Sequence, residues 1–163
     1  MTFAGNHSSA GVGATLALFG GDGSLVNCTF LGNTCDAPNM FAAAIFGSPN
    51  LTIQNTIFDA NVAQTAGAPM QCQVGTVTGT GDLQWPKNHL SGGGADAPCA
   101  PGISEDADPM LGAVGDHGGP VPTAVPMVGS PALGRGSSCP ARDARGKPRS
   151  QGTCTAGAVE GSS

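Results

Sequence analysis

In the first half of the chain, short hydrophobic runs recur at nearly constant spacing. An aromatic residue followed three positions later by asparagine occurs at Phe3, Phe30 and Phe58, and in modified form at Trp85. The intervals between these aromatic residues are 27, 28 and 27 positions. Apolar and polar residues alternate between them, as in LTIQNTIF (51–58), and glycine, proline, asparagine or aspartate separates one run from the next. Alternation with a period of two predicts short β-strands joined by tight turns.

A repeat of about 27 residues without a helical stripe predicts an all-β fold, a right-handed parallel β-helix of about three to four coils. Equivalent strands of successive coils lie roughly 4.8 Å apart, so equivalent residues stack. We expect Phe3, Phe30 and Phe58 to form an interior aromatic column. We also expect Asn27 and Asn55 to form a ladder at a corner, in which each amide donates to one neighbour and accepts from the other. The alternative is that these asparagines serve only as turn residues.

The pattern changes near residue 90, beyond which the sequence is rich in glycine and proline. We expect residues 1–90 to form the coils, and residues 91–163 to form a loop-rich C-terminal cap packed on the same solenoid. Met1 comes shortly before the first aromatic residue, so the sequence starts inside a coil. We therefore expect this chain to be the C-terminal end of a longer solenoid, whose open strand edges need a cap.

Composition narrows the class of protein further. Only 10% of the 163 residues are charged and 4% are aromatic, while Gly reaches 27 and Pro 13, which disfavours a helical bundle. The net charge of -5 leaves no basic face for a phosphate backbone, so we expect no nucleic-acid partner. No apolar run approaches the roughly 18 residues of a membrane-spanning helix, so we expect no membrane insertion by this segment. We expect the chain to be a monomer.

Cysteine usage points to an oxidising compartment. The six cysteines are Cys28, Cys35, Cys72, Cys99, Cys139 and Cys154. They form no C-x-x-C pair, and the three histidines are scattered, so the ligand spacing of a zinc site is missing. The sequence favours disulfides over free thiols, and hence a protein that works outside the reducing cytosol.

The C-terminal part of the chain carries three distinctive stretches. They are GDLQWP (81–86), DADPMLGAVGDHGGPVPTAVPMVGSPAL (106–133) and CPARDARGKPRSQGTCTAGAVE (139–160). These stretches resemble the C-terminal part of choice-of-anchor Q domain proteins, which are bacterial surface or secreted β-helix proteins. The F-x-x-N repeats upstream are similar to that family and to polymorphic outer-membrane-protein repeats.

The resemblance implies a covalent framework, a location and a role. It implies three disulfides, which join Cys72 to Cys99, Cys139 to Cys154 and Cys28 to Cys35. It also implies an extracellular or bacterial cell-surface location. We expect a non-catalytic structural or adhesive module, whose partners are surface glycans or another cell surface. One alternative is a carbohydrate-active β-helix whose active coils lie upstream of Met1, and another is an ice or mineral binder that uses the threonines of TVTGT (76–80).

Two groups of charged residues in the cap could bind ligands. The basic residues are Arg135, Arg142, Arg145, Lys147 and Arg149, which could hold an acidic polysaccharide or a sulfate. The alternative is that Arg145 and Arg149 pair with Asp143 or Glu160 inside the cap. The acidic residues Glu105, Asp106 and Asp108 are weak candidates for calcium ligands, because the alternating pattern of a calcium loop is missing. The alternative for Asp108 is that it caps a turn, and we expect no other metal or cofactor.

The coils carry few groups suited to catalysis. Their acids are Asp22, Asp36, Asp59 and Asp82. Asp59 and Asp82 could form a pair on one outer face, although their separation of 23 positions falls short of the repeat. No G-x-S-x-G nucleophile motif occurs. We therefore expect no catalytic residues in this segment.

Overall fold

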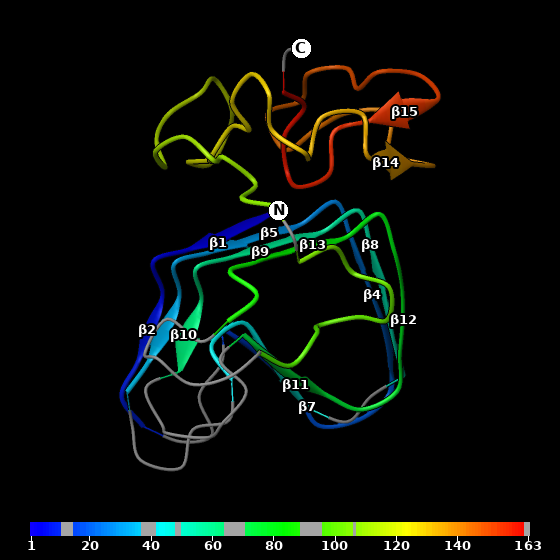
Figure 1. Ribbon diagram of the computed structural model, residues 1–163. Coiled ribbons are helices and arrows are strands. Elements are labelled where there is room, and N and C mark those ends of the chain that lie inside the picture. The colour runs from blue at the N-terminus through cyan, green and yellow to red at the C-terminus, as the bar shows by residue number, and fades with distance from the viewer. Residues whose placement is uncertain are drawn as a thin grey trace.

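The computed structural model of the protein describes residues 1–10, 15–36, 42–47, 50–63, 71–88, 96–105 and 107–161. Within these ranges the chain forms strands and connecting segments and no helix, which confirms the predicted all-β class. The strands assemble into four parallel sheets and one two-stranded antiparallel sheet in the described part of the chain (Figure 1).

Each parallel sheet takes one strand from each successive repeat. The aromatic sheet contains β1 (Thr2–Ala4), β5 (Thr29–Leu31), β9 (Ile57–Asp59) and β13 (Leu83–Trp85). A short sheet contains β2 (His7–Ser8), β6 (Thr34–Cys35) and β10 (Val62–Ala63). A third sheet contains β3 (Leu16–Leu18), β7 (Ile45–Gly47) and β11 (Cys72–Val74). The polar sheet contains β4 (Asp22–Val26), β8 (Asn50–Gln54) and β12 (Val77–Thr80).

The strand register reproduces the sequence repeat in space. Phe3 pairs with Phe30, and Phe30 pairs with Phe58. Their rings are stacked, with centroids 4.6 Å and 5.1 Å apart, and Phe30 and Phe58 are fully buried. Ile45 of β7 and Ile53 of β8 belong to the same buried cluster. The core is therefore an aromatic column surrounded by aliphatic side chains from the other sheets.

Trp85 does not continue this aromatic column, contrary to the spacing in the sequence. Gln84 pairs with Phe58, and Trp85 pairs with Asp59. Successive side chains of a strand point to opposite faces, so an offset of one position turns Trp85 outward and Gln84 inward. Gln84 is fully buried, and its amide bonds to the carbonyl of Ala97 and the amide of Cys99 at 3.0 and 2.7 Å. The column thus ends on a polar side chain that the segment 96–104 satisfies.

The asparagines of the F-x-x-N repeat form a continuous hydrogen-bonded ladder. Asn6 Nδ2 donates to Asn33 Oδ1 at 2.8 Å, and Asn33 Nδ2 donates to Asn61 Oδ1 at 2.6 Å. Asn33 and Asn61 are buried, so the ladder satisfies polar groups that water cannot reach. At the corner before the aromatic sheet, Asn55 Nδ2 also donates to Asn27 Oδ1 at 3.3 Å.

Asn27 and Asn55 hold the loop-rich segment 107–161 against the stack. Both adopt positive φ angles, 51° and 52°, which asparagine tolerates better than most residues. Asn27 Nδ2 donates to the carbonyls of Thr155 and Gly157, at 3.1 and 3.2 Å, and Asn55 Nδ2 donates to the carbonyl of Ser137 at 2.8 Å. In Figure 1 this segment, with β14 (Gly136–Ser137) and β15 (Thr153–Cys154), lies beyond the aromatic sheet.

Apolar contacts complete this docking. Ile57 and Leu83 point outward from the aromatic sheet and are fully buried beneath Ala132 and Ala156. The backbone comes so close at Gly157 that a Cβ there would lie 2.7 Å from Ile57 Cδ1. The outer face of the aromatic sheet is therefore an interior surface of the protein.

Two disulfides are present, joining Cys72 to Cys99 and Cys139 to Cys154, with Cα atoms 5.1 and 6.4 Å apart. Cys28 and Cys35 are both buried, and neither forms a disulfide.

The expected Cys28–Cys35 disulfide is thus wrong. The extended strand β5 separates the two residues, whereas a disulfide needs Cα atoms within about 7 Å. Cys28 packs in the main core, while Cys35 packs in a separate cluster with Ala43 and Ala63. Burial raises the pKa of the Cys28 thiol, which makes it less reactive.

Replacing Gly157 by alanine tests the docking of the cap. Gly157→Ala adds a methyl group against Ile57 and Thr29, whereas Gly152→Ala adds one in open space at a similar φ, +90° against +92°. Both variants place alanine at an unfavourable positive φ, so the difference between their free energies of unfolding reports the packing at position 157. We expect Gly157→Ala to lose about 2 kcal/mol more free energy of unfolding in urea. Equal losses would mean that the cap does not press on the sheet.

Removing one asparagine of the ladder tests the polar stack. Asn33→Ala leaves the partner groups on Asn6 and Asn61 and the carbonyl of Phe3 without their bonds. We expect a loss of about 3 kcal/mol in the free energy of unfolding, measured by circular dichroism in urea. Asn50→Ala serves as the control, because Asn50 is exposed and its side chain bonds to the exposed Asp22. This variant should lose less than about 0.5 kcal/mol of the free energy of unfolding. Similar losses in both variants would contradict the buried ladder.

Candidate functional site

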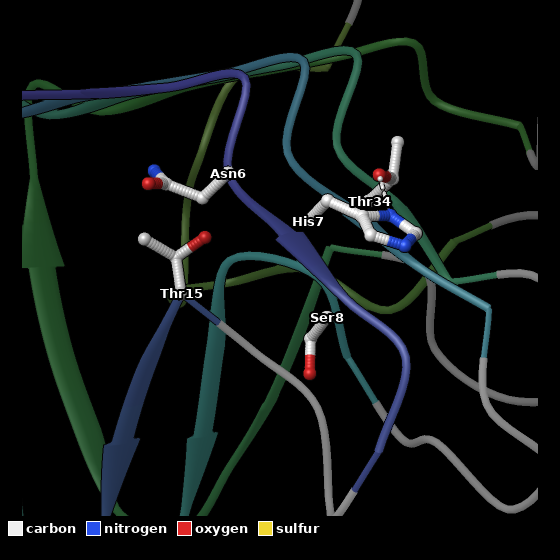
Figure 2. A pocket seen from close by; sticks show the side chains of 5 residues that line it. All are labelled: Asn6, His7, Ser8, Thr15 and Thr34. Atoms are coloured by element: carbon white, nitrogen blue, oxygen red, sulfur yellow. Dashed lines mark hydrogen bonds between the residues drawn. The ribbon is translucent and has the colours of Figure 1, made fainter.

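One recess of about 280 Å³ lies beside the short sheet, at the first repeat. Asn6, His7, Ser8, Thr15 and Thr34 line it (Figure 2). His7 Nδ1 lies 3.0 Å from Thr34 Oγ1 and 3.2 Å from Asp36 Oδ1. About half of each of the His7 and Asp36 side chains is exposed, 53% and 49%. The recess therefore offers a solvated imidazole with two polar partners.

Two of the hydroxyl residues that line the recess, Ser8 and Thr15, do not pair with the His7 imidazole. Ser8 follows His7 in β2, so their side chains point in different directions, as Figure 2 shows. Ser8 Oγ donates to the carbonyl of Ala10 at 3.1 Å, and Thr15 Oγ1 donates to the carbonyl of Ala43 at 3.0 Å. Nucleophilic catalysis needs a hydroxyl that donates to an imidazole, and the base is oriented by a third group at its other nitrogen. Thr34 Oγ1 and Asp36 Oδ1 both approach His7 at Nδ1, so Asp36 does not orient the ring from the opposite nitrogen. This arrangement suits hydrogen bonding to a ligand better than covalent chemistry.

The two acids that the sequence suggested as a pair have different partners. Burial, and second the charge of Asp108, raise the pKa of Asp59 to about 6. Burial raises the pKa of Asp82 to about 7, although the amides of Thr56 and Thr80 and the charge of Arg135 act in the opposite direction. Asp82 Oδ1 accepts from the Thr56 amide at 2.7 Å, and Asp82 Oδ2 is buried without a hydrogen bond. Both carboxylates thus belong to the packing between the sheets and the segments that cover them.

The acidic stretch proposed for calcium is only partly described. Asp106 lies outside the described residues, and Glu105 is partly buried. Asp108 Oδ1 accepts from the Met110 amide at 2.7 Å, which is the turn-capping role given above as its alternative. Across the residues that the structure describes, no three or more histidine, cysteine or acidic side chains gather as metal ligands. Calcium binding by this stretch stays a prediction.

The basic residues of the cap do not share one surface. Arg145 donates to Asp143 Oδ2 through Nε and Nη2, at 2.9 and 2.6 Å. Arg149 donates to Glu160 Oε2 at 3.2 Å and to the carbonyls of Thr155 and Gly157 at 2.9 and 2.8 Å. Internal pairing, the alternative to ligand binding, is thus what the structure shows for these two arginines.

Arg135 and Arg142 have different partners from these two arginines, since Arg135 donates to the Asp82 carbonyl at 3.3 Å and Arg142 donates to the Gly146 carbonyl at 2.7 Å. Lys147 borders a recess that Arg145 also lines. The five side chains therefore do not converge on a single anion.

Asp143 is the centre of the cap network. Burial acts to raise its pKa, but hydrogen bonds from Arg145 and from the amides of Glu160, Arg145 and Lys147 outweigh burial and hold the pKa below its usual value. The amide of Glu160 donates to Asp143 Oδ2 at 3.0 Å, while Glu160 Oε2 accepts from Thr155 N at 3.0 Å. The stretch from Cys139 to Glu160 thus contains the residues that fix the cap loops.

The polar sheet carries a set of exposed side chains of which the sequence suggested only the threonines of TVTGT (76–80) as a binding group. Along β8, Leu51 and Ile53 are buried, whereas Asn50 and Thr52 are exposed. Ser24, Thr52 and Thr78 lie in register on neighbouring strands. A shallow recess of about 420 Å³ runs over this face. The alternation within each strand was visible in the sequence, but the side-by-side arrangement depends on the register.

Comparisons of the chain with protein-family models, with curated proteins and with solved structures find no match. The fold and the site define the class of this protein as an all-β protein of stacked parallel strands with two disulfides. Such disulfides are typical of proteins in an oxidising environment. In the described part of the chain there is no apolar helix of membrane-spanning length.

The buried Asp82 carboxylate should make stability depend on pH. Its pKa is about 7 in the folded protein and 3.8 in the unfolded chain, so between these values the folded state binds more protons. The free energy of unfolding then falls as pH rises from 5 to 8. In Asp82→Asn this loss should be smaller by about 2 kcal/mol, measured by urea unfolding at each pH. The exposed Asp116→Asn serves as the control, and an unchanged slope in Asp82→Asn would refute the assignment.

Proposed function

We propose that this chain belongs to a right-handed parallel β-helix of an extracellular or bacterial surface protein, similar to choice-of-anchor Q domain proteins. Its role is structural or adhesive, and its partners are surface glycans or another cell surface. The observation that carries the proposal is the in-register stacking of parallel strands, seen in the pairs Phe3–Phe30 and Phe30–Phe58. A stack of this kind is rigid and presents long, regular outer faces.

The closure of the stack supports a structural role. Ser104 of the segment 96–104 forms a parallel bridge with Leu83, the first residue of β13. Cys99 of the same segment forms a disulfide with Cys72. One edge of the aromatic sheet is thereby paired, so it does not invite another strand. The second disulfide, Cys139–Cys154, joins the cap loops to each other. Covalent closure of this kind suits a protein exposed to conditions outside the cell.

The polar groups of the described residues favour binding over catalysis. The His7 imidazole meets both Thr34 and Asp36 at Nδ1, which is not the arrangement of a catalytic triad, and the buried Asp82 is covered by the chain. Two carboxylates that hydrolyse a glycosidic bond must both face the sugar. Asp82, only 1% exposed, does not.

An activity assay separates the adhesive role from a carbohydrate-active one. The purified chain is incubated with polygalacturonate and with neutral polysaccharides, with and without calcium, and release of reducing ends and of unsaturated uronate is measured. We expect no product above that of a heat-denatured sample. Product that disappears in His7→Ala, but not in the control Ser150→Ala at an exposed position of the cap, would overturn the non-catalytic role.

A further inference from the structure

The outer face of the polar sheet is lined by a regular array of hydroxyl groups. Ser24 pairs with Thr52, and Thr52 pairs with Thr78, so three exposed side chains form one row across the strands. Thr52 Oγ1 and Thr78 Oγ1 lie 3.2 Å apart. Each hydroxyl can donate one hydrogen bond and accept two, so the row keeps capacity for a ligand. Neighbouring members repeat at the strand spacing of roughly 4.8 Å.

A second row lies beside the first one. Asn50 Nδ2 donates to Asp22 Oδ1 at 3.0 Å, and Thr76 borders the same recess of about 420 Å³. The recess extends from Asp22 to Thr78 and crosses all three strands. A ligand seated there would meet amide, carboxylate and hydroxyl groups in two parallel rows.

The rest of the described chain leaves this face open. In Figure 1 the polar sheet forms one side of the stack, and no described segment lies outside it. The cap reaches only the end of β8, where Gln54 Nε2 donates to the Ser137 carbonyl at 2.9 Å. By contrast, Ile57 and Leu83 of the aromatic sheet are fully buried beneath the cap. The cap therefore covers the outer face of the aromatic sheet and leaves the outer face of the polar sheet exposed.

One exposed aromatic ring lies in the connection between β3 and β4, at the start of the polar sheet. Phe19 precedes β4 by three positions and is 78% exposed. Its ring lies 6.2 Å from that of Phe46, at an interplanar angle of 67°. A ligand that covers this ring would remove its apolar surface from water.

We propose that the polar sheet and Phe19 together bind a neutral polysaccharide, and this rests on the extracellular adhesive role proposed above. A sugar polymer presents hydroxyl groups at regular intervals, which the rows of Thr52 and Asn50 can pair with. The faces of its rings carry C–H groups, which pack on the electron-rich face of Phe19. Asp22 is the one charged side chain that points outward from β4, β8 or β12, and its charge opposes an acidic polymer.

The test is affinity electrophoresis of the full chain in gels containing dextran, a β-1,3-glucan, galactomannan or polygalacturonate. We expect at least one of the three neutral polymers to retard the chain more than polygalacturonate does. Thr52→Val removes one hydroxyl while keeping the shape, and Phe19→Ala removes the exposed ring. Each should weaken the apparent affinity several-fold, and the double variant by about tenfold. Thr153→Val, which removes an exposed hydroxyl from the cap, should bind like the unaltered chain.

Amide NMR shifts on addition of the retarding polymer locate the contact. We expect shifts in β4, β8, β12 and around Phe19, with thermal unfolding unchanged in all variants. No retardation by any neutral polymer, equal binding by the double variant, or binding by polygalacturonate alone would overturn the proposal. Those results would leave the absence of catalysis intact, whereas product formation would overturn the proposed role even if the polymer binds at this face.

Discussion

The structure depends on backbone hydrogen bonds between residues about one repeat apart. The amides of Thr29, Ile57 and Leu83 donate to the carbonyls of Met1, Cys28 and Thr56, each at 2.9 Å. These bonds fix the register, and the register decides which side chains stack. Because the groups of one repeat are satisfied by the next, a substitution in a buried row affects the layers on both sides of it. The Asn6–Asn33–Asn61 ladder and the phenylalanine column follow from the same constraint.

The last layer of such a stack needs different side chains, because no following layer supplies partners for its hydrogen-bonding groups. Here Gln84 takes the position of the phenylalanines, and the amide of Cys99 and the carbonyl of Ala97 take the place of the next layer. The cap covers the outer face of the aromatic sheet in a similar way, through backbone carbonyls that accept from Asn27 and Asn55. The polar sheet is treated differently, since its hydroxyl rows remain exposed. The cap therefore closes one face of the stack, and the face proposed above for ligand binding is a different one.

The repeat in the sequence was sufficient to predict the all-β class and the stacking of Phe3, Phe30 and Phe58, because those residues keep a nearly constant interval. The repeat was insufficient at Trp85. There Phe58 pairs with Gln84, 26 positions later, and the side chain of Trp85 points outward. The link between Cys28 and Cys35, which the family resemblance implied, failed because the extended strand β5 separates the two residues.

The candidate sites were harder to predict, because they join residues that are far apart in the chain. The charge of Asp108 acts on Asp59, and Arg135 bonds to the carbonyl of Asp82 across 53 positions. No local pattern signals such contacts. The row of Ser24, Thr52 and Thr78 likewise becomes visible only once the register is known, although each residue alternates with apolar neighbours in its own strand.

The register itself can be measured directly by NMR scalar couplings across hydrogen bonds. The structure predicts a coupling between the amide nitrogen of Ile57 and the carbonyl carbon of Cys28, and a second between Leu83 and Thr56. Couplings from Ile57 to Asn27 or Thr29 instead, or none to the preceding repeat, would contradict the stacked register and the faces that depend on it.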